Sequence, residues 1–135
     1  MDKVSDLVAE ALGRARVVRK CLDGRTIPLL EPCHRTFASD ISRRIGTRSI
    51  VNEAYLRDLE AFIVLLDELA ERETSHSWCG HEHDPDCGYL VAIRSERASV
   101  FVTMLDALID LSAAIEAALD AAEACRVANA LFEQS

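Results

Sequence analysis

The chain has 135 residues, of which 50% are apolar and only 5% are aromatic, and its formal net charge is −8. This length suits one domain that buries roughly two-thirds of its unfolded surface, and a supply of Ala, Leu, Val and Ile with few Gly and Pro favours helices. The acidic balance argues against general affinity for nucleic acid or anionic lipid, and no apolar run reaches the ~20 residues of a membrane span. We therefore predict a single α-helical domain over residues 1–135 in the cytoplasm, with no direct contact to nucleic acid or membrane.

The first segment has apolar residues at three- and four-residue steps over positions 4–22. This spacing predicts an amphipathic helix, with Asp2 as its N-cap and Gly24 as its end in a left-handed conformation. A second, shorter helix is predicted from Pro32, which suits a first helical position, up to Gly46. Two of the predicted bundle helices thus come from the first third of the chain.

A third helix is predicted after a cap at Thr47 or Ser49, with an apolar stripe that runs to about Glu73. A last helix is predicted from about Tyr89 to Phe132, where nothing forces a stop. Its apolar residues recur at alternating steps of four and three residues and form one stripe along the helix, which we call the seam. The seam consists of Phe101, Met104, Leu108, Leu111, Ile115, Ala118, Ala122, Cys125 and Phe132.

The last helix would span roughly 65 Å at 1.5 Å per residue, nearly twice the length of the third. We therefore expect either a break between Arg94 and Arg97, with Ser95 or Ser99 as a cap, or a free end that packs elsewhere. A homodimer through this helix is the alternative to a break. Because no strand alternation is visible, the predicted fold class is all-α: a helical bundle of four or five helices with a long C-terminal helix and a Cys/His loop between the third and fourth.

The Cys/His loop is the most unusual segment of the chain. Positions 76–88 hold three of the four histidines, two of the five cysteines and the only tryptophan. Thiolate and imidazole are the side chains that bind zinc, and Cys79, His81, His83 and Cys87 would make a two-sulfur, two-nitrogen set for a closed tetrahedral site. The spacing matches no common zinc finger. We predict a structural zinc site here, and a solvated polar loop is the alternative.

Other functions remain open for the same residues. Cys33 and His34, at the start of the second helix, are spare ligands if the bundle brings that end to the loop. His81 and His83 with an open coordination position would suit a metal-dependent enzyme, and the two loop cysteines would suit a thiol-based redox or metal sensor. We consider an enzyme the less favoured class.

Two Glu-x-x-His pairs have the spacing found in di-iron helical bundles, Glu31/His34 and Glu73/His76. Pro32 interrupts the first pair, and the second lies at a predicted helix end. We therefore interpret both pairs as coincidence.

Three arginines and two further cysteines are also considered as possible sites. Arg43, Arg44 and Arg48 flank a predicted helix junction and are weak evidence for an anion site. Cys21 and Cys125 lie on apolar stripes, so we predict that both are core residues.

The charge of the chain is unevenly distributed. Residues 1–50 carry ten Lys or Arg and six Asp or Glu, whereas residues 51–135 carry five and seventeen, so the net charges are +4 and −12. Between Arg97 and Arg126 the last helix has five acidic residues and no Lys or Arg. Steps of three or four place most of these acids along one line, where like charges repel. They are Asp106, Asp110, Glu116, Asp120 and Glu123.

A solvated helix face is one interpretation of these five residues, and docking against a basic surface is the other. That surface would be the first helix, with Arg14, Arg16, Arg19 and Lys20, or a separate basic partner. We predict a non-enzymatic acidic interaction or regulatory protein, an inhibitor or adaptor in type. In this prediction the five acidic residues bind a basic protein surface, for example one of nucleic-acid-handling machinery.

Overall fold

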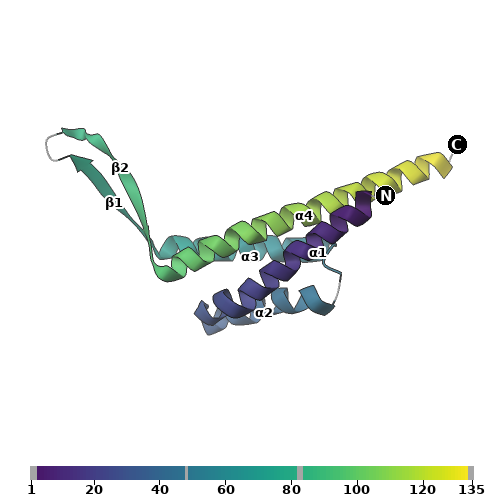
Figure 1. The fold of residues 1–135 in the computed structure, drawn as a ribbon, viewed down its shortest axis with the longest axis horizontal. Helices are drawn as coiled ribbons and strands as arrows, with labels where there is room; N and C mark the ends of the chain where they lie inside the picture. The colour runs from purple at the N-terminus through teal and green to yellow at the C-terminus, as the bar shows by residue number, and fades with distance from the viewer. Residues whose placement is uncertain (1–2, 48, 82–83, 134–135) are drawn as a thin grey trace.

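The computed structural model describes residues 3–47, 49–81 and 84–133, with side chains except at positions 47, 79–81, 84–87 and 89. Within these ranges the chain is mainly helical, with four α-helices and one two-stranded antiparallel sheet. Successive helices run in opposite directions, and the hairpin and the end of the last helix project from opposite ends of the bundle (Figure 1). The mainly all-α class and the long C-terminal helix are confirmed.

The first helix, α1 (Lys3–Cys21), continues directly into other helical geometry. A π-helical segment, η1 (Leu22–Thr26), and a short 3-10 segment, η2 (Ile27–Leu29), follow it. Gly24 lies within the π segment, and none of the described glycines has a positive φ, so the predicted left-handed end is wrong. Both ends of the π segment are buried, and this burial explains why the chain stays helical there. The predicted cap Asp2 lies outside the described residues.

The second helix, α2 (Pro32–Thr47), begins at the predicted proline. Ala38 and Ile41 are fully buried and Phe37 packs against the core, whereas Cys33 is exposed. The start of the helix therefore faces solvent, and its middle is held by the bundle.

The third helix, α3 (Glu53–Arg72), begins one turn later than predicted. The side chain of Asn52 caps it, because the backbone N–H of Tyr55 donates to Asn52 Oδ1 at 2.7 Å. The predicted caps, Thr47 and Ser49, do not hold this position. The apolar stripe of α3 is confirmed as core.

A β-hairpin follows α3, where the sequence had indicated only a loop. Its strands are β1 (Thr74–His81) and β2 (Asp84–Arg94), with Trp78 opposite Leu90 and an irregularity between Gly80 and His81. Trp78 is 57% exposed and Leu90 66% exposed, so the arm is solvated even at its apolar pair. The expectation that this part of the chain contains no strand is therefore wrong.

The last helix, α4 (Glu96–Glu133), is one unbroken helix of 38 residues. Ser95 caps its start, as predicted, because the backbone N–H of Ala98 donates to Ser95 Oγ at 3.1 Å. The helix starts later than the predicted Tyr89, which lies in β2. At 1.5 Å per residue α4 is about 57 Å long and the 20-residue α3 about 30 Å, so α4 extends beyond its neighbour.

The seam of α4 is buried only where other helices cover it. The covered members are Phe101, Met104, Leu108, Leu111, Ile115 and Ala118. The last three predicted members, Ala122, Cys125 and Phe132, are exposed, so the prediction of a core Cys125 is wrong. By length and composition α4 also suffices to cross a membrane, although 39% of its most apolar stretch is buried in the bundle. A core helix has the same properties.

A buried tyrosine joins α2 to α3 and makes the stability of the bundle sensitive to alkali. Tyr55 is 1% exposed, its hydroxyl donates to the Ile41 carbonyl at 3.0 Å, and the Arg44 guanidinium lies 4.9 Å from its ring centroid. Burial raises the pKa of Tyr55 to about 12 from an ordinary value of 10.0. The folded state therefore keeps a proton that the unfolded chain releases between these two values.

We expect the free energy of unfolding to fall by about 2 kcal/mol from this residue as the pH rises from about 10 to about 12. Below pH 10 both states hold the proton, and the contribution is fully present. Tyr55→Phe should lose the hydrogen bond, at about 1 kcal/mol, and should flatten this part of the pH profile. Urea unfolding of the unchanged protein and of Tyr55→Phe at several alkaline pH values measures how the free energy of unfolding changes with pH. The same pH dependence in both proteins would refute the role of Tyr55.

Candidate functional site

The five acidic residues predicted to bind a partner are all exposed on α4. We call Asp106, Asp110, Glu116, Asp120 and Glu123 the acidic face. The buried seam of the same helix packs on α1 and α3, so the bundle holds this surface rigidly over the first part of its length. A rigid helix presents charges in a defined pattern, as specific recognition requires.

Two members of the acidic face already have cationic neighbours. Arg14 Nη1 of α1 lies 3.8 Å from Asp110 Oδ2. The Arg126 guanidinium donates to both carboxylate oxygens of Glu123, with Nε 3.1 Å from Oε2, and this contact holds the pKa of Glu123 below its ordinary value. The alternative in which the acidic residues dock on α1 is thus realised at one contact.

The other three members of the acidic face have no cationic partner among the described residues. Within residues 3–47, 49–81 and 84–133, none of the ion pairs involves Asp106, Glu116 or Asp120. Each of these carboxylates is exposed. They are therefore the members of the acidic face that are available to an external cation.

One of these carboxylates lines a hollow at the base of the hairpin. The hollow has a volume of about 300 Å³ and brings Asp106 of α4 together with Asp67 and Glu71 of α3. Arg94 and His76 of the hairpin line its other side. With three carboxylates and one arginine, the hollow has a net negative charge. Its volume is large enough for the end of a lysine or arginine side chain.

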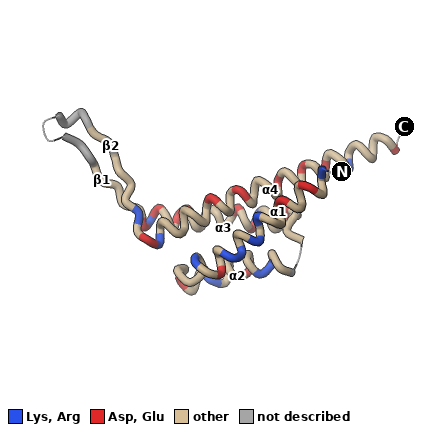
Figure 2. Tube along the Cα trace, viewed as in Figure 1, with Lys and Arg blue, Asp and Glu red and all other residues tan. Residues whose placement is uncertain are grey.

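The charge of the molecule is divided between its helices. Lys and Arg gather on α1 and α2, and Asp and Glu predominate on α3 and α4 (Figure 2). Across the divide, Arg44 of α2 contacts Asp58 of α3. Within α2, Arg43 and Arg44 also contact Asp40. The hydrogen bond from Arg43 lowers the pKa of Asp40. Both described arginines of the predicted anion site are thus engaged by carboxylates, and Arg48 lies outside the described residues.

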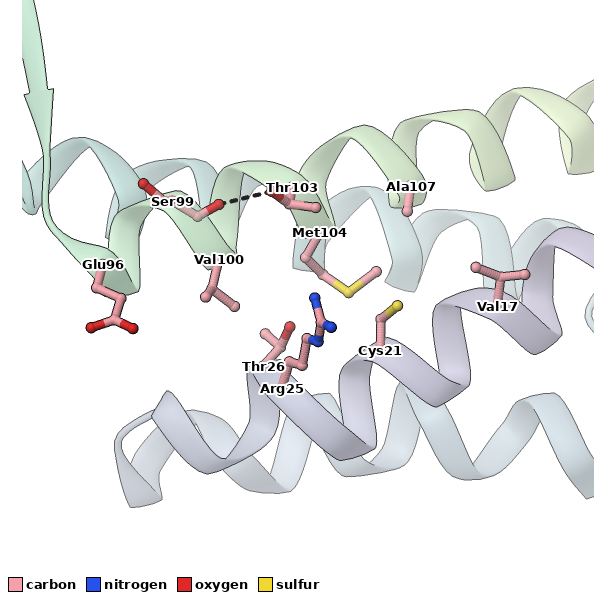
Figure 3. Close-up of a pocket in the computed structure, with 10 residues that line it drawn as sticks. All are labelled: Val17, Cys21, Arg25, Thr26, Glu96, Ser99, Val100, Thr103, Met104 and Ala107. Atoms are coloured by element: carbon pink, nitrogen blue, oxygen red, sulfur yellow. Dashed lines mark hydrogen bonds between the residues drawn. The ribbon is translucent and has the colours of Figure 1, made fainter.

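A second hollow, an apolar groove of about 400 Å³, separates α1 from the first half of α4 (Figure 3). Glu96 lies at one end and Val17 at the other, and Cys21 and Met104 point into the space between them. Cys21 is half-buried, so its predicted core role holds only in part. The groove is lined by Val17, Cys21, Arg25, Thr26, Glu96, Ser99, Val100, Thr103, Met104 and Ala107.

The sequence did not indicate this groove, because the residues that line it come from two helices far apart in the chain. Its lining residues include no histidine, and Thr103 Oγ1 donates to the Ser99 carbonyl at 3.0 Å, which occupies that hydroxyl. The arrangement therefore offers apolar contact area and no pairing of nucleophile and base.

The predicted zinc ligands belong to the outer part of the hairpin. The backbone of Cys79 pairs with Tyr89, and that of His81 with Asp84. The side chains of Cys79, His81 and Cys87, and all of His83, lie outside the described residues. The zinc site therefore stays a prediction.

The spare ligands are not close to the hairpin. Cys33 and His34 lie at the start of α2, at the end of the bundle from which the hairpin leaves, but the hairpin projects away from α2 (Figure 1). The bundle therefore does not bring the start of α2 to the Cys/His segment. The two places are separate.

Comparison of the chain with protein-family models, with curated protein sequences and with solved structures gave no match. A function for this chain is therefore argued from the exposure, charge and contacts of its own residues.

Proposed function

We propose that this protein is a non-enzymatic interaction protein that binds a basic protein surface through the acidic face of α4, as an inhibitor or adaptor. The observation that carries the proposal is the set of exposed carboxylates without ion-pair partners among the described residues, Asp106, Glu116 and Asp120. The acidic hollow formed by Asp67, Glu71 and Asp106 supports it.

A basic partner would relieve a repulsion that the bundle leaves in place. Like charges three or four residues apart on a helix cost a few tenths of a kcal/mol per pair, and a cation near them removes this cost. The hollow receives one Lys or Arg side chain, and the exposed turns beyond it contact further cations. Complementary charge of this kind raises the association rate and selects against acidic partners.

A decalysine peptide tests the chemistry without knowledge of the partner. Its affinity, measured by isothermal titration calorimetry, should weaken at least about tenfold between about 50 and 300 mM NaCl, because salt screens contacts between exposed charges. An uncharged peptide of the same length should not bind. Affinity that does not change with salt would contradict the proposal.

The proposal places the protein in the cytoplasm, where Cys79 and Cys87 stay reduced and, with His81 and His83, bind structural zinc at the hairpin tip. A solvated two-stranded arm has little apolar burial of its own, and a metal at its tip would stabilise it. Elemental analysis should find one zinc equivalent fewer in a Cys79→Ala, His81→Ala variant than in the unchanged protein, and the order of the hairpin should be lost with it. Retention of the full metal content in that variant would refute this ligand set.

A homodimer is a second proposal, and the projecting end of α4 favours it. Beyond Ala118 the helix leaves the bundle, and Val127 and Leu131 are 44% and 64% exposed. Its small residues, such as Ala124 and Ala128, allow close approach of a second helix. The corresponding segment of a second copy has the matching apolar side chains, so the two ends cover each other.

Val127→Glu with Leu131→Glu is expected to keep the protein monomeric, because charged side chains at these positions oppose the burial of the helix ends. Analytical ultracentrifugation of the unchanged protein should show a dimer whose fraction rises with concentration. Val64→Glu, which adds a charge at another exposed valine, should leave that behaviour unchanged. A monomeric unchanged protein at the highest concentration would contradict the proposal.

A further inference from the structure

A group of metal-ligating side chains lies away from the hairpin, at the start of α2. The Glu31 carboxylate, the Cys33 thiol and the His34 imidazole offer ligand atoms that all lie within 4.8 Å of one another. Cys33 Sγ is 3.9 Å from Glu31 Oε2. We propose that these three side chains bind Zn²⁺, with a fourth coordination position open to water.

The start of the helix brings these residues together. The Glu31 carbonyl accepts hydrogen bonds from the backbone N–H groups of His34 at 2.9 Å and Arg35 at 3.2 Å, so Glu31 occupies the N-cap position. An N-cap side chain reaches toward the second and third helical residues, which here are Cys33 and His34. Pro32, which interrupted the Glu-x-x-His pattern for a helix interior, is well placed at the first helical position.

The distances suit zinc after a small movement. Tetrahedral Zn²⁺ with a sulfur ligand at about 2.3 Å and nitrogen or oxygen ligands at about 2.0 Å separates its donor atoms by about 3.3–3.6 Å. The present donors lie within 4.8 Å of one another, so they must approach by up to about 1.5 Å. Glu31 and Cys33 are exposed and free to turn, whereas His34 is half-buried and supplies the more rigid ligand.

The local charges also favour a cation. The neighbouring Arg35 is turned toward backbone carbonyls, with Nε 2.8 Å from the Leu30 oxygen and Nη2 3.5 Å from the Pro28 oxygen. Among the described ion pairs none involves Glu31. A thiolate and a carboxylate balance the charge of Zn²⁺, and thiolate with imidazole selects it over Mg²⁺ or Ca²⁺.

Three protein ligands and one open position differ from the four protein ligands of a closed structural site. The fold of α2 does not need the metal, because its middle is held by the core. We therefore expect metal binding to leave the stability of the bundle nearly unchanged. The effect of metal loss therefore distinguishes this site from the hairpin, because loss of metal there is expected to disorder the two strands.

Cobalt reports on the site because a thiolate ligand gives Co²⁺ a strong near-ultraviolet charge-transfer band. A Cys79→Ser, Cys87→Ser variant, which lacks the hairpin thiols, should bind one equivalent of Co²⁺ with this band, and Zn²⁺ should displace it. Adding Cys33→Ser should abolish the band, and adding His34→Ala should weaken the affinity at least about tenfold.

Cys125→Ser provides the matched control, because Cys125 is an exposed helical cysteine like Cys33. Added to the same background, it should leave the band and the stoichiometry unchanged. Within this background, circular dichroism should be the same with and without Cys33→Ser and Cys125→Ser, because both cysteines are exposed. A band that is absent before Cys33 is replaced, or that persists after its replacement, would overturn the proposal.

Discussion

Replacing Phe62 with alanine is expected to lower the free energy of unfolding by about 3–5 kcal/mol, a large part of the stability of a domain of this size. Phe62 is fully buried in α3, and its ring centroid lies 5.6 Å from that of Phe37 in α2. The substitution removes apolar contacts, among them the one with Phe37, and leaves a cavity that the packed core cannot fully close. Urea unfolding followed by circular dichroism measures the change.

Val64→Ala is the matched control on the same helix. Val64 lies two residues from Phe62 and is 58% exposed. Its replacement removes little buried surface, and alanine is the better helix former, so the change should stay within about 0.5 kcal/mol. Equal losses for the two substitutions would mean that α3 does not pack on the face described above.

Neutralising Asp106, Glu116 and Asp120 together, as Asp106→Asn, Glu116→Gln and Asp120→Asn, should weaken decalysine binding at least about tenfold at low salt. Each carboxylate removed takes away one contact worth about 0.5 kcal/mol, and three such contacts amount to about a factor of ten. Calorimetric titration measures the affinity, and the melting temperature should not fall, because like-charge repulsion on α4 is relieved.

The control variant changes the net charge by the same amount at other places. It combines Asp6→Asn on α1 with Glu53→Gln at the start of α3 and Glu96→Gln at the start of α4, all three exposed. If binding depends on the acidic face, this variant keeps most of its affinity. An equal loss in both variants would show that only overall charge matters.

The helical part of the fold follows from the sequence because each helix has one buried face. The seam of α4 is buried up to Ala118, as its periodicity predicts. The stripe of α1 is buried from Ala11 on, except for the half-buried Leu12, and its first turns are half-buried. Periodicity does not reveal where the neighbouring helices end, and for this reason the prediction of a core Cys125 is wrong and Ala122 of the same seam is exposed as well. They continue the apolar character of α4 beyond the last helix that covers it.

The hairpin was not predictable from alternation, because both of its faces are in solvent. A strand shows a two-residue period only when one face is buried, and here Trp78, Leu90 and Ile93 are all more than half exposed. The β-branched Val91 and Ile93 were the available signal, and they were instead joined to the following helix.

The sites were predictable to different degrees. The exposure of all five acidic residues follows from their spacing opposite the seam, but the contact between Arg14 and Asp110 joins residues on separate helices and depends on the packing of α1 against α4. The metal-type group at Glu31 was set aside because its spacing fails inside a helix. At a helix start the same spacing brings the side chains together. Which of the two situations applies depends on whether Pro32 is the first residue of the helix, as it is here, or lies inside it.

The most direct test of the acidic face is a residue-by-residue map of decalysine binding by ¹H–¹⁵N NMR. We predict that the largest amide shifts fall on α4 between Asp106 and Glu123 and around Asp67 and Glu71 in the adjoining hollow. They should diminish together when salt is raised. Shifts centred on other surfaces, such as the exposed first turns of α1 and α3, would contradict the assignment of this face as the binding surface.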